Sequence, residues 1–316
     1  MSGIDPTPRC SPSLRSQDAA NLAVSITRDA SKQTYYTIRL LVDRNLVPDA
    51  FRAYAYFRWL DDLLDAETGS KEEKIALVNR QQSILELGYA GISLEGLTLE
   101  EQMLVDLVRN DREKDSGLRS YLTNMMAVMI FDTQRRGRFI SQSELSTYTR
   151  SLATAVTDAL HHFIGHDCQP PHCEERYLAV NGAHIVHMLR DALEDAAAGY
   201  YNFPGEFVEA VGSSLPDIDS PAYREWVKRR VQQAREDFRT GREAIRQVKN
   251  LRCRLAGFAY TARFEWMLRA IERDGYRLRR DYPERKSLGA GLWMVWMTLT
   301  AFFAPPEWSG KLVNFG

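Results

Sequence analysis

Apolar residues recur at helical spacing along almost the whole chain. They return every three or four positions, which places them on one face of an α-helix, and no five-residue stretch alternates apolar and polar side chains as a strand would. The pattern therefore predicts an all-α fold. The segments expected to be helical are 25–42, 48–65, 71–87, 99–109, 116–136, 144–164, 174–198, 221–250, 255–276 and 288–304.

The helical segments follow one another without a Pro-, Gly- or Ser-rich linker in the middle of the chain. At roughly 100–200 residues per domain the length allows two domains, but long helical enzymes can remain single. We predict one helical domain over residues 19–287. Residues 1–18 are expected to form a flexible leader, and 288–316 an apolar C-terminal helix and tail packed on the same domain.

Two of the helical segments carry pairs of aspartates four residues apart, Asp61 with Asp65 and Asp191 with Asp195. On a helix this spacing puts both carboxylates on one face, where they repel each other unless a cation lies beside them. Mg²⁺ is usually held by one or two carboxylates together with phosphate oxygens. A single pair is also typical of a solvated helix face. Two pairs inside apolar helices favour a metal site that binds a diphosphate.

These motifs and their order resemble the squalene/phytoene synthase family. The resemblance covers residues 25–287, most of the chain, and depends on Ser31-Lys32, on the stretch from Tyr54 to Asp65 and on the stretch from Arg190 to Asp195. It implies an isoprenoid-synthase-like helical bundle with a central cavity. It also implies that Mg²⁺, with Mn²⁺ as an alternative, helps to ionise an allylic prenyl diphosphate.

The resemblance also suggests roles for individual residues. Ionisation leaves a carbocation, which needs a dry pocket with aromatic walls. The predicted site residues are Tyr54, Arg58, Tyr148 and Arg190 in catalysis, Ser31, Lys32, Tyr36, Phe57, His184 and Phe264 in substrate binding, and Asp61, Asp65, His187, Asp191 and Asp195 at the metal.

The chain departs from the family pattern near the second motif. The family usually has Gln and Asn three apart there, and this chain has His184 and His187. Thr154 and Thr157 replace two glycines that follow a tyrosine. Asn202 occupies the position of a tyrosine after the motif, and an arginine of the family is also lost there.

Three functions remain open. The resemblance implies head-to-head condensation of two farnesyl or geranylgeranyl diphosphates. The departures keep open a second reaction, in which a single prenyl group is transferred to an aromatic acceptor or cyclises. The third hypothesis is a non-catalytic protein that binds polyprenyl lipids, and the four retained aspartates argue against it.

Composition excludes several other classes of function. The chain has 41 basic and 42 acidic residues and a net charge of -1, so no global field favours nucleic acid. There is no Walker A sequence. The four cysteines show no CxxC spacing, and the chain begins without a basic-then-apolar signal peptide, so we expect a reduced, cytoplasmic protein.

Two further segments suggest binding. All six histidines lie between positions 161 and 187, and His166, Cys168, His172 and Cys173 would be a zinc-site alternative, although their spacing matches no common finger. Residues 288–304 carry no charge. That is short for a membrane span, so we expect a core or lid helix, with peripheral contact to a membrane surface as the next alternative.

Overall fold

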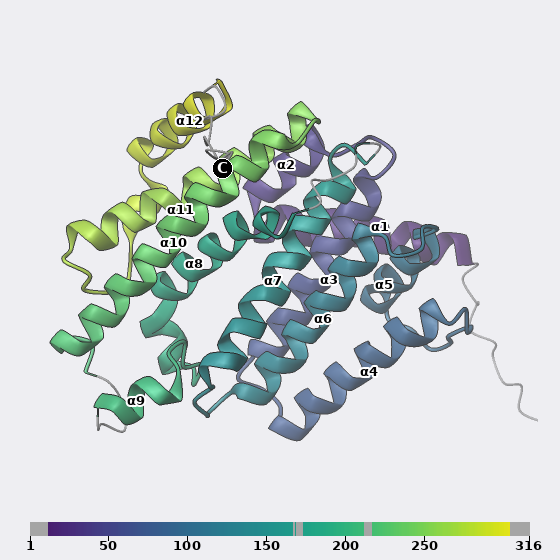
Figure 1. The fold of residues 1–316 in the computed structure, drawn as a ribbon. Coiled ribbons are helices and arrows are strands. Elements are labelled where there is room, and N and C mark those ends of the chain that lie inside the picture. Colours follow the sequence, from purple (N-terminus) through teal and green to yellow (C-terminus); the bar gives the residue numbers. More distant parts are fainter. Residues whose placement is uncertain (1–11, 167, 169–172, 212–216, 304–316) are drawn as a thin grey trace, which may run out of the picture. The chain divides into compact units, whose positions relative to one another are not determined.

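Every regular element of the described chain is a helix. The computed structural model describes residues 12–166, 168, 173–211 and 217–303 (Figure 1). Within these ranges there is no β-strand, and the only strand-like pairing is an isolated bridge between Ile140 and Pro204. The prediction of an all-α fold is therefore confirmed.

The chain divides into two compact units. Unit 1 comprises the residues up to Arg136 together with Thr154–His166, and unit 2 comprises Gly137–Ala153 and the residues from Asp167 onward. Helix α7 (Gln142–Phe163) belongs to both, because its first half lies in unit 2 and its second half in unit 1. The single domain over residues 19–287 stays a prediction.

Unit 1 is organised around α3, which packs against both α1 and α5 (Figure 1). Tyr56 and Leu60 of α3 are fully buried in this packing. Helices α4 and α5 each begin with a capping box, in which the side chain and backbone of the cap residue and a glutamate bond each other reciprocally. The helices before α7 are α1 (Pro12–Ala30), α2 (Lys32–Leu41), α3 (Val47–Asp65), α4 (Lys71–Tyr89), α5 (Leu99–Asn110) and α6 (Gly117–Arg135).

The N-terminal region differs from the prediction in two ways. Helix α1 already begins at Pro12, so residues 12–18 of the expected leader are helical. Ala19 and Ala23 are fully buried on one face of this helix, and Ser16 Oγ donates a hydrogen bond of 2.7 Å to Asp106. The expected helix over 25–42 is interrupted at Ser31, which has an extended backbone and caps α2 by accepting a hydrogen bond from the Thr34 amide.

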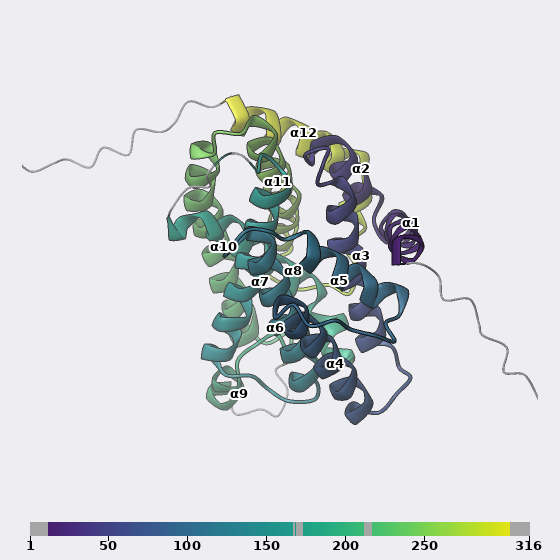
Figure 2. The same cartoon turned by 90° about the vertical axis from the view of Figure 1, so that its right-hand side faces the viewer.

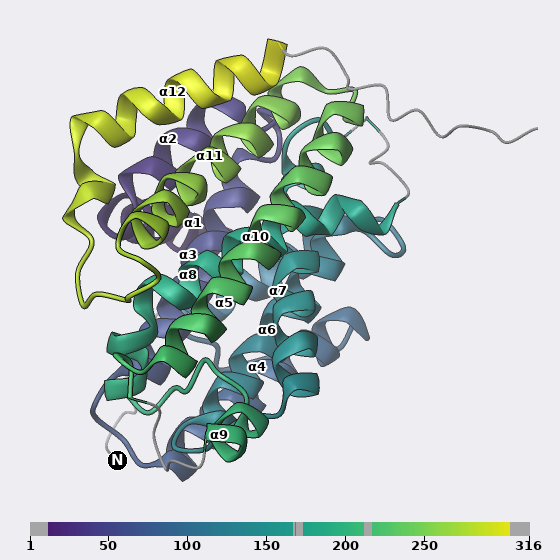
Figure 3. The ribbon, with the colours of Figure 1, turned by 60° about the vertical axis from the view of Figure 1, so that its left-hand side comes forward.

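Unit 2 is organised around α8, which packs against α10 and α11 (Figure 2). Figure 3 shows α12 running along α11. Two glycines, Gly182 of α8 and Gly241 of α10, let the α8 and α10 backbones approach closely: a Cβ on Gly241 would lie 2.3 Å from the Ala179 nitrogen. The elements after α7 are η1 (Glu174–Tyr177), α8 (Leu178–Ala197), α9 (Gly205–Val211), α10 (Pro221–Gln247), α11 (Leu251–Arg273), η2 (Pro283–Lys286) and α12 (Leu288–Phe303).

The helix boundaries in unit 2 follow the local capping chemistry. The segment predicted over 221–250 ends at Gln247, because Asn250 caps the next helix by accepting hydrogen bonds from the amides of Arg252 and Cys253. The short helix α9 was not predicted, since seven residues are too few to show a period.

Candidate active site

The first aspartate motif lies at the C-terminal end of α3, in unit 1. Arg58 bonds to both neighbouring acids: its Nε donates to Asp62 Oδ2 at 3.1 Å, and its Nη1 lies 3.6 Å from Asp61 Oδ2. The side chains of Arg58 and Asp61 are each 43% exposed, so the pair is accessible to a ligand. The helix thus presents Asp61 and Asp65 on a polar face that solvent reaches.

The Asp61 carboxyl is poorly neutralised. Burial and the neighbouring charge of Asp65 raise the pKa of Asp61 to about 7, and the partial compensation by Arg58 does not offset them. Asp132 of α6 adds to the negative field and also raises this pKa. A carboxylate pair in this condition is stabilised by a bound cation.

Two unit 1 residues near this motif were not predicted. Asp132 is a third acid near Asp61, and its Oδ1 accepts a hydrogen bond of 2.5 Å from Arg135 Nε. Lys74 Nζ donates to the carbonyl oxygens of Leu64, at 2.8 Å, and of Ala66, so it caps the end of α3 that carries the motif. Neither residue shows a spacing signal in the sequence, because each comes from another helix.

The second motif lies on α8, in unit 2, and its first aspartate is already compensated. Arg190 Nε donates to Asp191 Oδ1 at 2.6 Å, and His187 Nε2 lies 3.0 Å from Asp191 Oδ2. Burial alone would raise the pKa of Asp191, but the hydrogen bonds from Arg190 and His187 outweigh it and hold that pKa below its usual range.

The second aspartate of this motif has an amide partner. Asn202, in the loop after α8, is 5% exposed, and its Nδ2 donates to Asp195 Oδ2 at 2.5 Å. This residue occupies the place where the resemblance puts a tyrosine. Sequence comparison marked the position only as a departure, and the structure shows it in direct contact with the motif.

The two histidines of α8 differ in their environments. His184 is buried, and its ring lies 5.3 Å from that of Tyr148 on α7. The side chain of His187 is 49% exposed and contacts Asp191. The structure therefore brings Tyr148 and His184 together as neighbouring aromatic rings. Their roles in catalysis and substrate binding stay predictions.

The remaining predicted residues are divided between the two units. Ser31 is the cap of α2, and Lys32 is its exposed first residue. Tyr36 is 60% exposed and forms an edge contact with Tyr35. Phe57 is buried between Tyr56 and Tyr121 in unit 1, Tyr54 is half-buried in the same helix, and Phe264 is buried in the core of unit 2.

The carboxylates differ in how well they suit a divalent ion. Asp61 and Asp65 are the pair better suited to a divalent ion, because both are accessible to solvent and the charge of Asp65 helps to raise the pKa of Asp61. Asp191 suits an added ion less directly, since Arg190 and His187 already satisfy it. Across the described ranges no group of three or more His, Cys, Asp or Glu side chains converges as a metal site. His172 of the zinc alternative lies outside the described residues.

The Thr157 hydroxyl stands out in the second half of α7. Thr157 is 4% exposed, and its Oγ1 has no hydrogen-bond partner among the residues that the structure describes. Here the family pattern has a glycine. Buried hydroxyls are normally bonded, so this group carries a desolvation cost that a glycine would not.

Comparison with known proteins identifies the family of the chain. A profile of squalene/phytoene synthases matches residues 27–289. The chain belongs to the squalene/phytoene synthase family. No curated protein sequence matches it.

Two solved structures share the fold. Squalene synthase HpnC from Alicyclobacillus acidocaldarius is 21% identical and superposes with a TM-score of 0.66, covering 84% of this chain and 97% of that one. A dehydrosqualene synthase in complex with ligand is 15% identical, with a TM-score of 0.65 and coverage of 92% and 98%. The resemblance found in the sequence is therefore confirmed at the level of family and fold.

Proposed function

We propose that the protein is a Mg²⁺-dependent prenyltransferase that ionises an allylic prenyl diphosphate and joins two farnesyl or geranylgeranyl diphosphates head to head. Membership of the squalene/phytoene synthase family supports a transferase of isoprenoid biosynthesis. The observation that carries the proposal is the retention of both aspartate pairs at a spacing of four residues, one on α3 and one on α8. In the first pair, burial and the charge of Asp65 raise the pKa of Asp61 to about 7.

The aspartates of the two motifs are the proposed ligands of the metal ion. Asp61 and Asp65 would hold Mg²⁺, with Mn²⁺ as an alternative, and Asp191 and Asp195 are the second carboxylate pair proposed to bind a metal ion. When bound, the ion supplies positive charge that stabilises the departing diphosphate. Asp132 would strengthen the attraction for the cation without being a ligand itself.

The arginines would bind phosphate oxygens. Arg58 and Arg190 now direct their guanidinium groups at aspartates of their own helices. A planar guanidinium forms paired hydrogen bonds with carboxylate and phosphate alike. A diphosphate that arrives with its ion would therefore exchange one oxyanion partner for another at these two side chains.

A second candidate reaction is transfer of a single prenyl group to an aromatic acceptor, or its cyclisation. It is favoured by the local departures from the family: Asn202 at Asp195, and the buried His184 ring against Tyr148. These changes alter the side chains beside the second motif. The non-catalytic lipid-binding hypothesis predicts no diphosphate release at all.

One assay separates the three functions. Purified protein is incubated with farnesyl or geranylgeranyl diphosphate and Mg²⁺, pyrophosphate release is measured and the organic products are identified. Release with a C30 or C40 product supports the proposal. Release with another product supports the second reaction, and no release under any condition supports the lipid binder.

Variants of the motifs test the proposed site. Asp61→Asn and Asp191→Asn are each expected to lower the rate of release by at least about a hundredfold, since each removes a carboxylate from an electrostatically demanding site. Glu194→Gln is the control, because Glu194 is an exposed acid next to Asp195. If either aspartate variant retained the wild-type rate at saturating Mg²⁺, the site assignment would be wrong.

We also propose that α12 docks on the surface of a lipid bilayer. Its outer face exposes Leu292, Val295, Trp296, Leu299 and Phe303 at helical spacing, while Thr298 is buried on the inner face. A helix used only for packing would bury its most apolar side. No helix in the described part of the chain has both the length and the apolar character needed to cross a membrane.

Basic residues around α12 favour an anionic surface. The guanidinium groups of Arg254 and Arg269, both on α11, lie over the rings of Phe302 and Trp293, at 5.3 Å and 3.7 Å from the ring centroids. The two glutamates of α11, Glu265 and Glu272, are each paired with an arginine of α10. The helix beneath the apolar face therefore keeps a surplus of positive charge, which attracts acidic lipids.

Flotation with vesicles tests this docking. The double variant Trp296→Glu and Leu299→Glu should lose binding to vesicles of phosphatidylglycerol and phosphatidylcholine. Ile92→Glu in unit 1 is the control, because Ile92 is also an exposed aliphatic residue. Equal binding of the double variant and the wild type would rule out α12 as the docking surface.

A further inference from the structure

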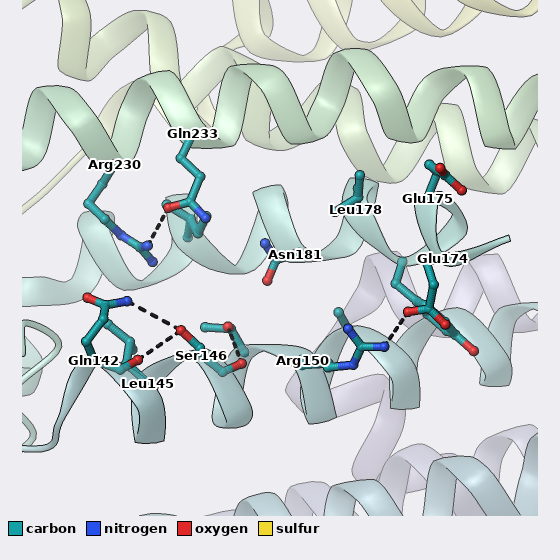
Figure 4. Close-up of a pocket in the computed structure, with 14 residues that line it drawn as sticks. Gln142, Leu145, Ser146, Arg150, Glu174, Glu175, Leu178, Asn181, Arg230 and Gln233 are labelled. Carbon is teal, nitrogen blue, oxygen red and sulfur yellow. Dashed lines mark hydrogen bonds and ion pairs between the residues drawn. The ribbon is translucent and has the colours of Figure 1, made fainter.

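A polar groove lies in unit 2, apart from every residue assigned to the active site. It has a volume of about 390 Å³ and is bounded by the first half of α7, η1, the start of α8 and α10 (Figure 4). Volumes of about 300–1,000 Å³ are typical of small-molecule sites. None of the predicted site residues lines this groove.

One wall of the groove is formed by Arg230 and Gln233 of α10, a helix that packs against α8. Asn181 of α8 also lines the groove and donates a hydrogen bond of 2.6 Å to Oδ2 of the buried Asp237. This wall therefore places an arginine and two amides where two helices meet.

The guanidinium of Arg230 lacks an acidic partner. Its Nη1 donates to Gln233 Oε1 at 2.7 Å, and it forms no ion pair with any side chain in the described ranges. Burial lowers the pKa of Arg230 to about 10, and the charge of Asp237 offsets this only in part. A desolvated guanidinium with most of its donors free is a strong site for an oxyanion.

The helices on this side of the groove are closely packed. A Cβ on Gly182 would lie 3.0 Å from the Ala234 carbonyl oxygen and 3.1 Å from Asp237 Cβ, so α8 and α10 are in close backbone contact beside the groove.

The opposite end of the groove carries negative charge. Figure 4 shows Glu174 and Glu175 at the end away from Arg230. Glu174 is paired with Arg150. The exposed Glu175 side chain has no ion-pair or hydrogen-bond partner among the described residues. The groove is thus positive at one end and negative at the other, with Ser146, Asn181 and other neutral polar groups along it.

We propose that this groove is a second binding site, for a small hydrophilic molecule that carries a phosphate or carboxylate group. Arg230 binds the oxyanion. A long polyanion is disfavoured, because its far end would meet Glu174 and Glu175. This site is independent of prenyl transfer and does not rest on that function.

Calorimetric titration in EDTA, without Mg²⁺, tests the site with four probes: inorganic phosphate, acetate, O-phosphoethanolamine and ethanolamine. Phosphate or acetate should bind to the wild type, and which of them binds tells phosphate from carboxylate selectivity. Arg230→Gln should weaken that binding at least about tenfold, as loss of a charge-assisted bond does. Arg229→Gln is the matched control, since Arg229 is its 74%-exposed neighbour.

Two further variants keep the test decisive. Ser146→Phe fills the groove from an exposed position of α7, so it should abolish binding without removing a buried group. Glu175→Gln should leave the binding of phosphate and of O-phosphoethanolamine unchanged, because Glu175 lies at the end of the groove away from Arg230. The proposal is overturned if no probe binds at about 10 mM, or if binding survives both Arg230→Gln and Ser146→Phe, which would place the anion elsewhere.

Discussion

The side-chain amide of Asn202 donates a hydrogen bond of 2.5 Å to Asp195, the last aspartate of the second motif. Because Asn202 is buried, this hydrogen bond holds the Asp195 carboxylate in one orientation. Asn202→Ala should lower the rate of pyrophosphate release about tenfold, the effect of losing one hydrogen bond to a charged group.

Asn202→Tyr is the informative companion, since it installs the residue typical of the family. Its tyrosine hydroxyl is expected to recover part of the rate lost in Asn202→Ala. Wild-type rates in Asn202→Ala, measured at saturating substrate, would show that Asp195 needs no such support.

His187 is predicted to tune metal preference through its contact with Asp191. Imidazole suits Mn²⁺ or Co²⁺ better than Mg²⁺, so His187→Asn should lower the ratio of Mn²⁺ to Mg²⁺ activity. His187→Ala should cost more activity than His187→Asn. A lowered thermal midpoint with an unchanged metal ratio would mean that His187 only stabilises the helix.

The unbonded hydroxyl of Thr157 predicts an unusual stabilising substitution. Thr157→Val keeps the shape and removes a buried polar group, so the free energy of unfolding should rise by about 1 kcal/mol. Thr133→Val is the matched control, because Thr133 is also buried but donates to the Met129 carbonyl at 2.8 Å. Urea unfolding should show opposite signs for the two variants.

The close contact of α8 and α10 predicts a sharp cost at Gly241. In Gly241→Ala the new Cβ would meet the backbone of Ala179, so the helices must separate, and about 2 kcal/mol or more of stability should be lost. Gly291→Ala is the control, since that helical glycine has open space around it and should gain up to about 1 kcal/mol. Equal thermal midpoints for the two variants would contradict the packing.

His162 predicts a loss of stability in acid. Burial, with a smaller effect of His166, lowers the pKa of His162 to about 4. In the unfolded chain the histidine pKa is about 6.5, so between about pH 6.5 and 4 the unfolded state binds a proton at His162 and the folded state does not. The free energy of unfolding therefore falls as pH drops through this interval. The loss is on the order of 3 kcal/mol.

Denaturant unfolding at several pH values measures this slope. His162→Gln should reduce the dependence of the unfolding free energy on pH over that interval, whatever its effect at neutral pH. A variant with the full wild-type slope would assign the acid sensitivity to other groups.

Much of the fold was predictable because its signals are local. Helical periodicity predicted most of the long helices, although residues 12–18 of α1 were expected to form a flexible leader. The spacing of Asp61 with Asp65 and of Asp191 with Asp195 led to the family. The break at Ser31 was missed because the apolar pattern continues through it while a side-chain cap turns the backbone.

The partners of the site residues could not be predicted, because they come from other helices and loops. Nothing in the sequence tells that Asn202 bonds Asp195, that Asp132 acts on Asp61, or that Lys74 caps α3. Arg230 lies in a segment that the sequence predicted only as a helix. Whether a given arginine on an amphipathic helix meets water or a groove depends on its neighbours in space.

The uncovered apolar face of α12 has a practical consequence for every measurement above. In buffer without detergent or lipid, two molecules can remove Leu292 and Phe303 from water by associating through these apolar faces. Apparent rates and thermal midpoints will then vary with protein concentration. The Trp296→Glu and Leu299→Glu background, which stays dispersed, is the one in which the other variants should be compared.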